Sequence, residues 1–270
     1  MTRATLTDVL GPTHAVAGFV CLGWEDARAY VAAAEAEQAP VILQAGPGAR
    51  AHMPLAVWGA MLGALADAAT VPVVVHLDHG ESVAMCEAAI AAGFTSVMFD
   101  GSALPLADNT AQTARIATLA HAMSVSCEGE IGFVGYAAGA AGRGTDPAEA
   151  AQFADRTGVD AMAVSVGNVH LVQADAVPLD EDLIAAIRAV TTTPLVIHGG
   201  SGVPADQRSA LARAGAVAKF NIGTEMRQVW GTALRDTLNA DATLFDRIAI
   251  LRATETPLAL AAARVIASLR

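Results

Sequence analysis

The sequence is poor in basic residues. It holds 16 Lys and Arg against 27 Asp and Glu, which gives a formal net charge of −11, and Lys219 is its single lysine. A surface of this sign repels nucleic acids and anionic membranes. We therefore expect neither a nucleic acid nor a membrane as a partner.

Cysteines and long apolar runs are also scarce. Cys21, Cys86 and Cys127 form an odd set without a CxxC pair, which argues against a disulfide framework or a zinc knuckle. The longest apolar runs, such as residues 55–66, reach only about a dozen residues and are too short to cross a bilayer. The first ten residues lack the charged-then-apolar order of a signal peptide. These features predict a cytoplasmic protein with reduced thiols.

What the chain has in abundance is an alternation of short β-branched runs with alanine-rich segments of helical length. The predicted strands are residues 15–20, 40–45, 71–77, 95–99, 124–130, 160–165, 194–198 and 216–221, and the predicted helices are 25–38, 54–69, 81–92, 105–122, 147–157, 180–190, 204–214 and 225–238. Eight such units without a linker predict one (β/α)8 TIM barrel, an α/β fold, over residues 1–270. Residues 243–269 predict an additional C-terminal helix, suited to packing or oligomerisation.

Polar residues gather where the predicted strands end. They are Gln44, His76, Asp78, His79, Asp100, Glu128, Glu130, Ser165, His170, His198 and Asn221. Polar groups at the ends of buried strands are costly unless they are paired or ligated. In (β/α)8 barrels the chemistry lies where strands pass into the loops that precede helices, so this repeated placement predicts an active site.

Three of these residues, His79, His170 and His198, come from three different predicted strands, and closure of a barrel would bring them together. Three imidazoles with an open position are typical of a catalytic divalent metal, usually zinc. The alternative is that they are hydrogen-bonded core residues, which sequence spacing alone does not exclude. Asp100 could orient a ligand imidazole through its second nitrogen, and His76 is interpreted as a core or supporting residue.

Glu128 and Glu130 lie two apart on one predicted strand and therefore share a face. One alternative is a pair of carboxylates that form salt bridges inside the barrel. Because Lys219 is the only lysine and arginines are rare near strand ends, we favour a nearby metal or a second cation.

Two glycine-rich loops offer backbone amides to an anion. The segment "HGGSG", residues 198–202, follows the seventh predicted strand, and "NIGTE", residues 221–225, follows the eighth at the start of a helix. Helix N-termini and glycine-rich turns favour phosphate, and these two loops hold it in many barrels. The pair predicts a phosphate site.

Taken together, "VPVVVHLDHGES", "GFTSVMFDGS", "GRGTDPAEAAQFADRTGVDAMAVSVG", "PLVIHGGSGVP" and "AKFNIGTE" resemble the class II, metal-dependent fructose-bisphosphate and tagatose-bisphosphate aldolase family, nearly throughout the chain. The resemblance implies a lyase that cleaves a ketose phosphate, or a related adduct of a ketone and an aldehyde, through an enediolate stabilised by Zn2+ or by another divalent metal such as Co2+ or Mn2+. We expect a homodimer or a homotetramer.

The resemblance also implies roles for individual residues. His79, His170 and His198 fall on the metal ligands, Asp78 falls on the catalytic acid and base, and Glu130 falls near an alternative metal position. Glu128, Asp100 and His76 are expected to support the metal or to bind it in an alternative position. The residues expected to bind substrate and phosphate are Gly199, Ser201, Asn221, Gly223, Thr224 and Gln44.

The sequence departs from the family pattern at several positions that should face the ligand. Val20 stands where the family tends to have asparagine, Gly46 where serine is common, and Leu171 where glycine follows the histidine. In the family, the loop after the fifth predicted strand carries a "GGxE" motif whose glutamate moves a proton at the enediolate carbon. This chain lacks that glutamate, which leaves Tyr136, a water or Asp78 to exchange the proton. Two alternatives therefore remain, another metal-dependent lyase or isomerase and a non-catalytic binding paralogue.

Overall fold

The computed structural model describes residues 2–137, 139, 141–172 and 176–270, and Tyr136 by its backbone alone. Parallel strands close into a barrel: β2 (Val16–Val20), β3 (Val41–Ala45), β4 (Val73–Gly80), β5 (Ser96–Phe99), β6 (Ser126–Ile131), β8 (Ala161–Val164), β10 (Leu195–Ile197) and β11 (Lys219–Ile222). Pairing runs in the order β4, β3, β2, β11, β10, β8, β6, β5, and β4 also pairs with β5. The predicted (β/α)8 barrel is confirmed.

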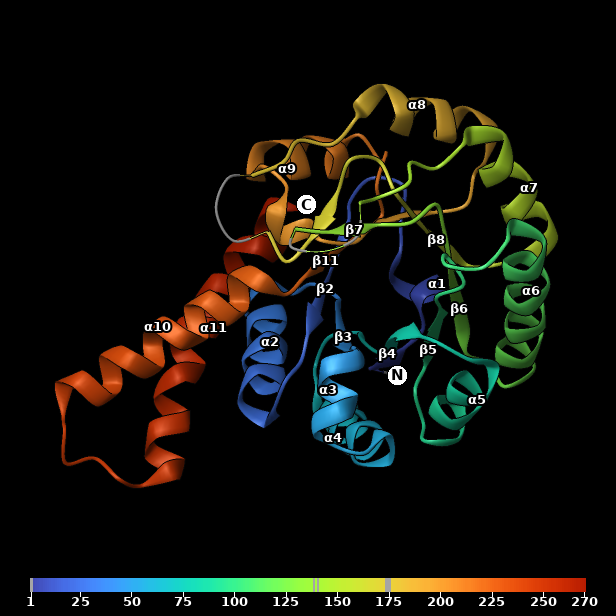
Figure 1. Cartoon of the computed structure of the whole chain (residues 1–270). Coiled ribbons are helices and arrows are strands. Elements are labelled where there is room, and N and C mark those ends of the chain that lie inside the picture. The colour runs from blue at the N-terminus through green and yellow to red at the C-terminus, as the bar shows by residue number, and fades with distance from the viewer. Residues whose placement is uncertain (1, 138, 140, 173–175) are drawn as a thin grey trace.

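Helices surround the barrel in chain order (Figure 1). They are α2 (Trp24–Glu37), α4 (Leu55–Ala68), α5 (Val83–Ala91), α6 (Leu106–Ala122), α7 (Pro147–Thr157), α8 (Glu181–Val190), α9 (Ala205–Arg213) and α10 (Thr224–Ala240). Side-chain caps fix several of their starts, as where Asp146 accepts hydrogen bonds from the amides of Ala148 and Glu149 and Pro147 occupies the first helical position. Each predicted helix is present within a few residues of its expected bounds.

The amino-terminal end of the barrel is closed by two short elements that the sequence did not predict, β1 (Arg3–Ala4) and α1 (Leu6–Val9). β1 pairs with the start of β4. Ala4, Leu6 and Val9 are buried in one apolar cluster with inward-facing strand residues, and the Leu6 amide donates to Ser126 Oγ at 3.0 Å. Apolar side chains therefore fill most of this end of the barrel.

The additional C-terminal helix is α11 (Arg247–Ser268), which confirms the expected helical tail. It forms an antiparallel hairpin with α10 that reaches beyond the barrel (Figure 1). Phe245 at the turn of the hairpin is 92% exposed and Ile248 is 62% exposed. In the described part of the chain, no helix is both long enough and apolar enough to cross a membrane.

Four short elements lie in the loops at the carboxyl ends of the strands. They are α3 (Pro47–His52), the paired strands β7 (Gly135–Tyr136) and β9 (Val169–His170), and a 3-10 turn at Gly200–Gly202. The sequence analysis treated all four as loop. They border the cavity described next.

Candidate active site

Three histidines converge at the carboxyl end of the barrel. His79 lies on β4, His170 on β9, and His198 directly after β10. Their ring centroids are 4.6 Å apart for His79 and His198, 5.3 Å for His79 and His170, and 5.7 Å for His170 and His198. One nitrogen of each ring lies within 4.8 Å of the others, a spacing that a single metal ion can bridge. The convergence expected from barrel closure is present.

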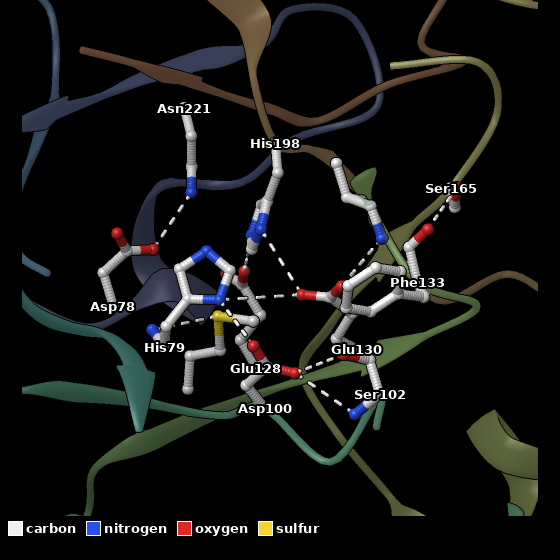
Figure 2. Close-up of polar contacts among 12 residues, drawn as sticks. Asp78, His79, Asp100, Ser102, Glu128, Glu130, Phe133, Ser165, His198 and Asn221 are labelled. Carbon is white, nitrogen blue, oxygen red and sulfur yellow. Dashed lines mark hydrogen bonds and ion pairs between the residues drawn. The ribbon is translucent and has the colours of Figure 1, made fainter. Parts of the chain in front are cut away.

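His79 is held in place by a carboxylate. Its Nδ1 lies 2.7 Å from Asp100 Oδ2, while Asp100 Oδ1 accepts hydrogen bonds from the amide and the hydroxyl of Ser102 (Figure 2). Because a neutral imidazole that donates from Nδ1 carries its lone pair on Nε2, Asp100 fixes the tautomer of His79. The supporting role expected for Asp100 requires this contact, and the role itself stays a prediction.

His198 is held in the same manner from the opposite side. Its Nε2 lies 3.2 Å from Glu128 Oε1, so the lone pair is on Nδ1. Nδ1 is buried without a hydrogen-bond partner, as is Glu130 Oε2, and these two atoms lie 3.4 Å apart. Buried polar atoms without partners are costly, so both atoms fit a site built for a cation.

The charges of the cluster also favour a bound cation. Burial lowers the pKa of His79, but the Asp78, Asp100 and Glu130 carboxylates outweigh it and raise that pKa to about 10. Burial raises the pKa of Glu130 to about 8, with Asp100 adding to the shift. Burial lowers the pKa of His170 to about 4, and that of His198 falls as well, mainly for the same reason. The site therefore attracts one positive charge and keeps two imidazoles neutral, as metal ligation requires.

Glu128 has the partner that the sequence analysis did not expect. Lys219 Nζ lies 2.6 Å from Glu128 Oε2, and both side chains are fully buried inside the barrel. Lys219 also lies 3.4 Å from His76 Nε2, and His76 Nδ1 lies 2.8 Å from Ser96 Oγ. The sequence analysis favoured a metal or a second cation beside Glu128, because basic residues that could pair with this carboxylate are scarce in the chain. That interpretation is corrected, since Lys219 supplies the positive charge.

Asp78 is adjacent to His79 and faces the same cavity. Its Oδ1 accepts a hydrogen bond from Asn221 Nδ2 at 3.2 Å (Figure 2). On its other side the chain has no side chain at Gly46, where an added Cβ would lie 3.0 Å from Oδ2. One carboxylate oxygen is therefore positioned by Asn221 and the other faces the open space beside Gly46.

The cavity above the histidines has a volume of about 310 Å³. It is lined by Val20, Gly46, Pro47, Gly48, Ala49, Asp78, His79, His170, Leu171, Gly199, Ser201, Asn221, Gly223, Thr224 and Arg227. Most predicted substrate-binding residues are in this lining. Gln44 is not among them, because its side chain is fully buried beside Gly18.

The two glycine-rich loops meet at the rim of the cavity. Ser201 Oγ accepts hydrogen bonds from the amides of Gly223 and Glu225, which ties the loop after β10 to the first turn of α10. With its oxygen engaged in this way, the Ser201 hydroxyl keeps its proton to donate to a ligand. Gly199 has a φ of +65°, and an added Cβ would lie 2.3 Å from the Val169 carbonyl oxygen, so only glycine fits there.

Several residues of the site escaped the sequence analysis. Arg227, on the first turn of α10, brings a cation to the cavity, and an exposed helix arginine carries no signal that marks it in sequence. Asn168 donates from Nδ2 to the His198 carbonyl oxygen and fixes that backbone. Tyr136, considered for proton exchange, has a side chain outside the described residues.

A (β/α)8 barrel with three convergent imidazoles, two of them held by carboxylates, is the arrangement typical of an enzyme with a catalytic metal. The chain matches the family model described as fructose-bisphosphate aldolase class-II over residues 2–270. It belongs to that family and is a metal-dependent aldolase, a lyase of carbon–carbon bonds. Family membership is compatible with the glutamate missing from the loop after β6 and with Val20, Gly46 and Leu171 at the cavity.

Individual relatives span nearly the whole chain. The 6-phospho-5-dehydro-2-deoxy-D-gluconate aldolase of Shouchella clausii strain KSM-K16 is 40% identical over 247 residues, which cover 89% of this chain and 84% of the relative. The fructose-bisphosphate aldolase of Geobacillus stearothermophilus is 38% identical over 251 residues, which cover 90% and 87%. The crystal structure of the YdjI aldolase from Escherichia coli K12 has a TM-score of 0.86 at 28% identity, covering 100% of this chain and 97% of that one.

Proposed function

We propose that this aldolase binds a divalent metal through His79, His170 and His198 and cleaves a phosphorylated ketose or keto acid that carries fewer hydroxyls than fructose 1,6-bisphosphate. The observation that carries the metal site is that one nitrogen of each of the three rings lies within 4.8 Å of the others, while a carboxylate lies within hydrogen-bond distance of His79 and another of His198. Zinc suits three imidazoles, and Co2+ or Mn2+ are the alternatives.

When bound, the metal supplies a Lewis acid that polarises the substrate carbonyl. Asp78 accepts the proton of the substrate hydroxyl as the carbon–carbon bond breaks and returns it in the reverse direction. Asn221 holds one oxygen of Asp78, so the reactive oxygen is the one beside Gly46. Asp100 and Glu128 keep the imidazoles in their ligating tautomers, and Glu130 lies close enough to His79 and His198 to serve an alternative metal position.

The substrate class follows from what lines the cavity. Ser201, Gly223 and Thr224 surround a helix N-terminus and Arg227 adds a cation, which together favour a phosphorylated substrate. Val20 and Gly46 present no polar side chain where a sugar hydroxyl would seek a partner, and an unpaired hydroxyl in a closed site is penalised. The relative from Shouchella clausii is named for a 2-deoxy sugar acid phosphate, which agrees with a less hydroxylated substrate.

Fructose 1,6-bisphosphate is the second candidate, because the relative from Geobacillus stearothermophilus is named for it. A retro-aldol screen of the zinc-loaded enzyme separates the two. We expect 6-phospho-5-dehydro-2-deoxy-D-gluconate or a similar deoxy substrate to be cleaved with the higher kcat/KM. A value for fructose 1,6-bisphosphate in the ordinary enzyme range, about 10⁴ M⁻¹s⁻¹ or above, together with slower cleavage of deoxy substrates, would reverse the assignment.

We further propose a cytoplasmic homodimer or homotetramer. Free, buried Cys21, Cys86 and Cys127 support a reducing compartment. Exposed apolar side chains on the α10–α11 hairpin, among them Phe245 and Ile248, support contact between subunits. Sedimentation of the purified protein tests the assembly, and a monomer at micromolar concentration would contradict it.

A further inference from the structure

Asp78 and His79 are consecutive residues, yet both line the cavity. In a regular strand, neighbouring side chains point to opposite faces, so one of the two should point away. The structure resolves this with a bulge: Leu77 pairs with Val97 and Gly80 with Phe99, which leaves two residues of β4 opposite Met98 alone. His79 adopts a φ of +50°, in the left-handed region that a residue with a Cβ seldom occupies.

Such a conformation persists only where its surroundings enforce it. Strand pairing cannot do so here, because β3 ends opposite Leu77 and the register with β5 is broken at the bulge. The His79 amide donates to the sulfur of Met98 at 3.4 Å, a weak acceptor. The carbonyl groups of the two bulged residues need donors from elsewhere.

Arg50 supplies those donors. Its Nη1 donates to the Asp78 carbonyl oxygen at 2.5 Å and to the Ala45 carbonyl oxygen at 2.9 Å, and its Nη2 donates to the His79 carbonyl oxygen at 2.8 Å. The guanidinium thus hydrogen-bonds β4 on the edge that faces β3, just beyond the last residue pair of these two strands. Planar and forked, it suits carbonyl groups in a fixed arrangement better than a single ammonium would.

The helix that carries Arg50 is itself anchored. α3 follows directly after β3, and its Ala49 carbonyl oxygen accepts a hydrogen bond from Nε1 of the fully buried Trp58 at 2.9 Å. Arg50 is therefore attached to a fixed support and is half-buried rather than free in solvent.

We propose that Arg50 is a positioning residue that holds the β4 bulge so that Asp78 and His79 face the site together. This inference rests on the proposed function, in which His79 binds the metal and Asp78 moves the proton. Arg50 is not among the residues that line the cavity, and it acts through the two carbonyl groups. Hydrogen-bonded partners that orient metal ligands commonly change metal affinity or activity by 10- to 100-fold when removed.

Cobalt binding to the metal-free protein tests this without an assay of turnover. Arg50→Ala and Arg50→Gln are compared with wild type by Co2+ titration and visible absorption spectrum. Arg50→Gln keeps most of the side-chain length, so it remains informative if Arg50→Ala fails to fold. Arg188→Ala is the matched control, because Arg188 is also half-buried and donates to a backbone carbonyl, that of Thr193, at the opposite end of the barrel.

We expect both Arg50 variants to bind Co2+ at least about 10-fold more weakly with an altered spectrum, whereas Arg188→Ala matches wild type within about twofold. Arg50 variants with wild-type affinity and spectrum would overturn this inference alone, as would an equal loss in Arg188→Ala. A wild-type protein that does not bind Co2+ would overturn the proposed metal site, and this inference with it.

Discussion

The ammonium group of Lys219 lies 2.6 Å from Oε2 of Glu128, and water reaches neither side chain. The opposite oxygen of Glu128 accepts the hydrogen bond from His198. One buried ion pair therefore neutralises the carboxylate and leaves it as an acceptor for an imidazole of the site. The only lysine of the chain is engaged in structure and is not available as a nucleophile.

The first prediction concerns this lysine. Borohydride added with a cleavable substrate should leave the mass of the protein unchanged, because a Schiff base needs a free amine. A chelator should stop turnover of the same sample. Trapping of a covalent adduct at Lys219, together with activity that resists the chelator, would contradict the metal-dependent reaction.

The same ion pair makes a stability prediction. Lys219→Met leaves Glu128 as a buried charge without its cation, which should reduce the free energy of unfolding by about 3–5 kcal/mol. Lys219→Met combined with Glu128→Gln should recover part of that loss, because no charge is then left unpaired. Urea denaturation of the metal-free proteins measures both. Equal stability of the single and double variants would show that the charge of Glu128 is not the cause.

Metal retention should depend on each histidine of the cluster. We expect His79→Ala, His170→Ala and His198→Ala each to lose the metal on gel filtration and to lose activity, since two imidazoles hold a divalent ion much more weakly than three. His52→Ala is the control, because this exposed side chain lies at the end of α3 outside the cluster. Metal content is measured by elemental analysis. A full complement in all three variants would mean that the ion binds elsewhere.

Metal binding should release protons. The pKa of about 10 means that metal-free His79 holds a proton at pH 7, and this proton must leave before the imidazole can bind a metal. Affinity should therefore rise with pH through neutrality. Conversely, because the folded pKa lies above the unfolded 6.5, protonated His79 stabilises the metal-free fold below pH 6.5, and this contribution is lost as the pH rises through about 10.

Calorimetric titration at pH 7 in two buffers of different ionisation enthalpy counts the protons. Release of about one proton or more per metal is expected. Identical enthalpies in both buffers would show that His79 is already neutral.

Leu171 occupies a backbone conformation that suits glycine. Its φ is +59°, and its side chain is 48% exposed at the cavity. Leu171→Gly should relieve about 1 kcal/mol of backbone strain and raise the melting temperature. Leu22 is also an exposed leucine, but its φ is not positive, so Leu22→Gly should not raise the melting temperature. The Leu171→Gly variant should also lower KM for phosphorylated substrates, and a lower melting temperature would contradict the strain argument.

Periodicity and strand-end chemistry were sufficient to predict the barrel and the histidine cluster. The runs at 15–20 and 71–77 became β2 and β4, because β-branched residues buried on both faces leave little alternative to a parallel strand. The cluster followed because strands of a closed barrel bring their carboxyl ends together. Polar residues at those ends therefore had to meet.

The parts that sequence reasoning missed are held by the backbone or by single long-range pairs. Nothing in the sequence around Arg50 shows that its partners are carbonyl groups on β4. The bulge at His79 leaves no composition signal, since the residue is neither glycine nor asparagine. The pairing of Lys219 with Glu128 joins positions 91 apart in sequence, and only the register of the closed barrel brings them together.

The apolar plug formed by Ala4, Leu6 and Val9 has a consequence for the passage of ligands. Among the described residues, apolar side chains fill the amino-terminal end of the barrel, and the cavity opens at the other end. The barrel is thus closed at one end and open at the other. We expect the substrate to enter and both fragments to leave through the same opening, so the fragment nearer the imidazoles should depart second.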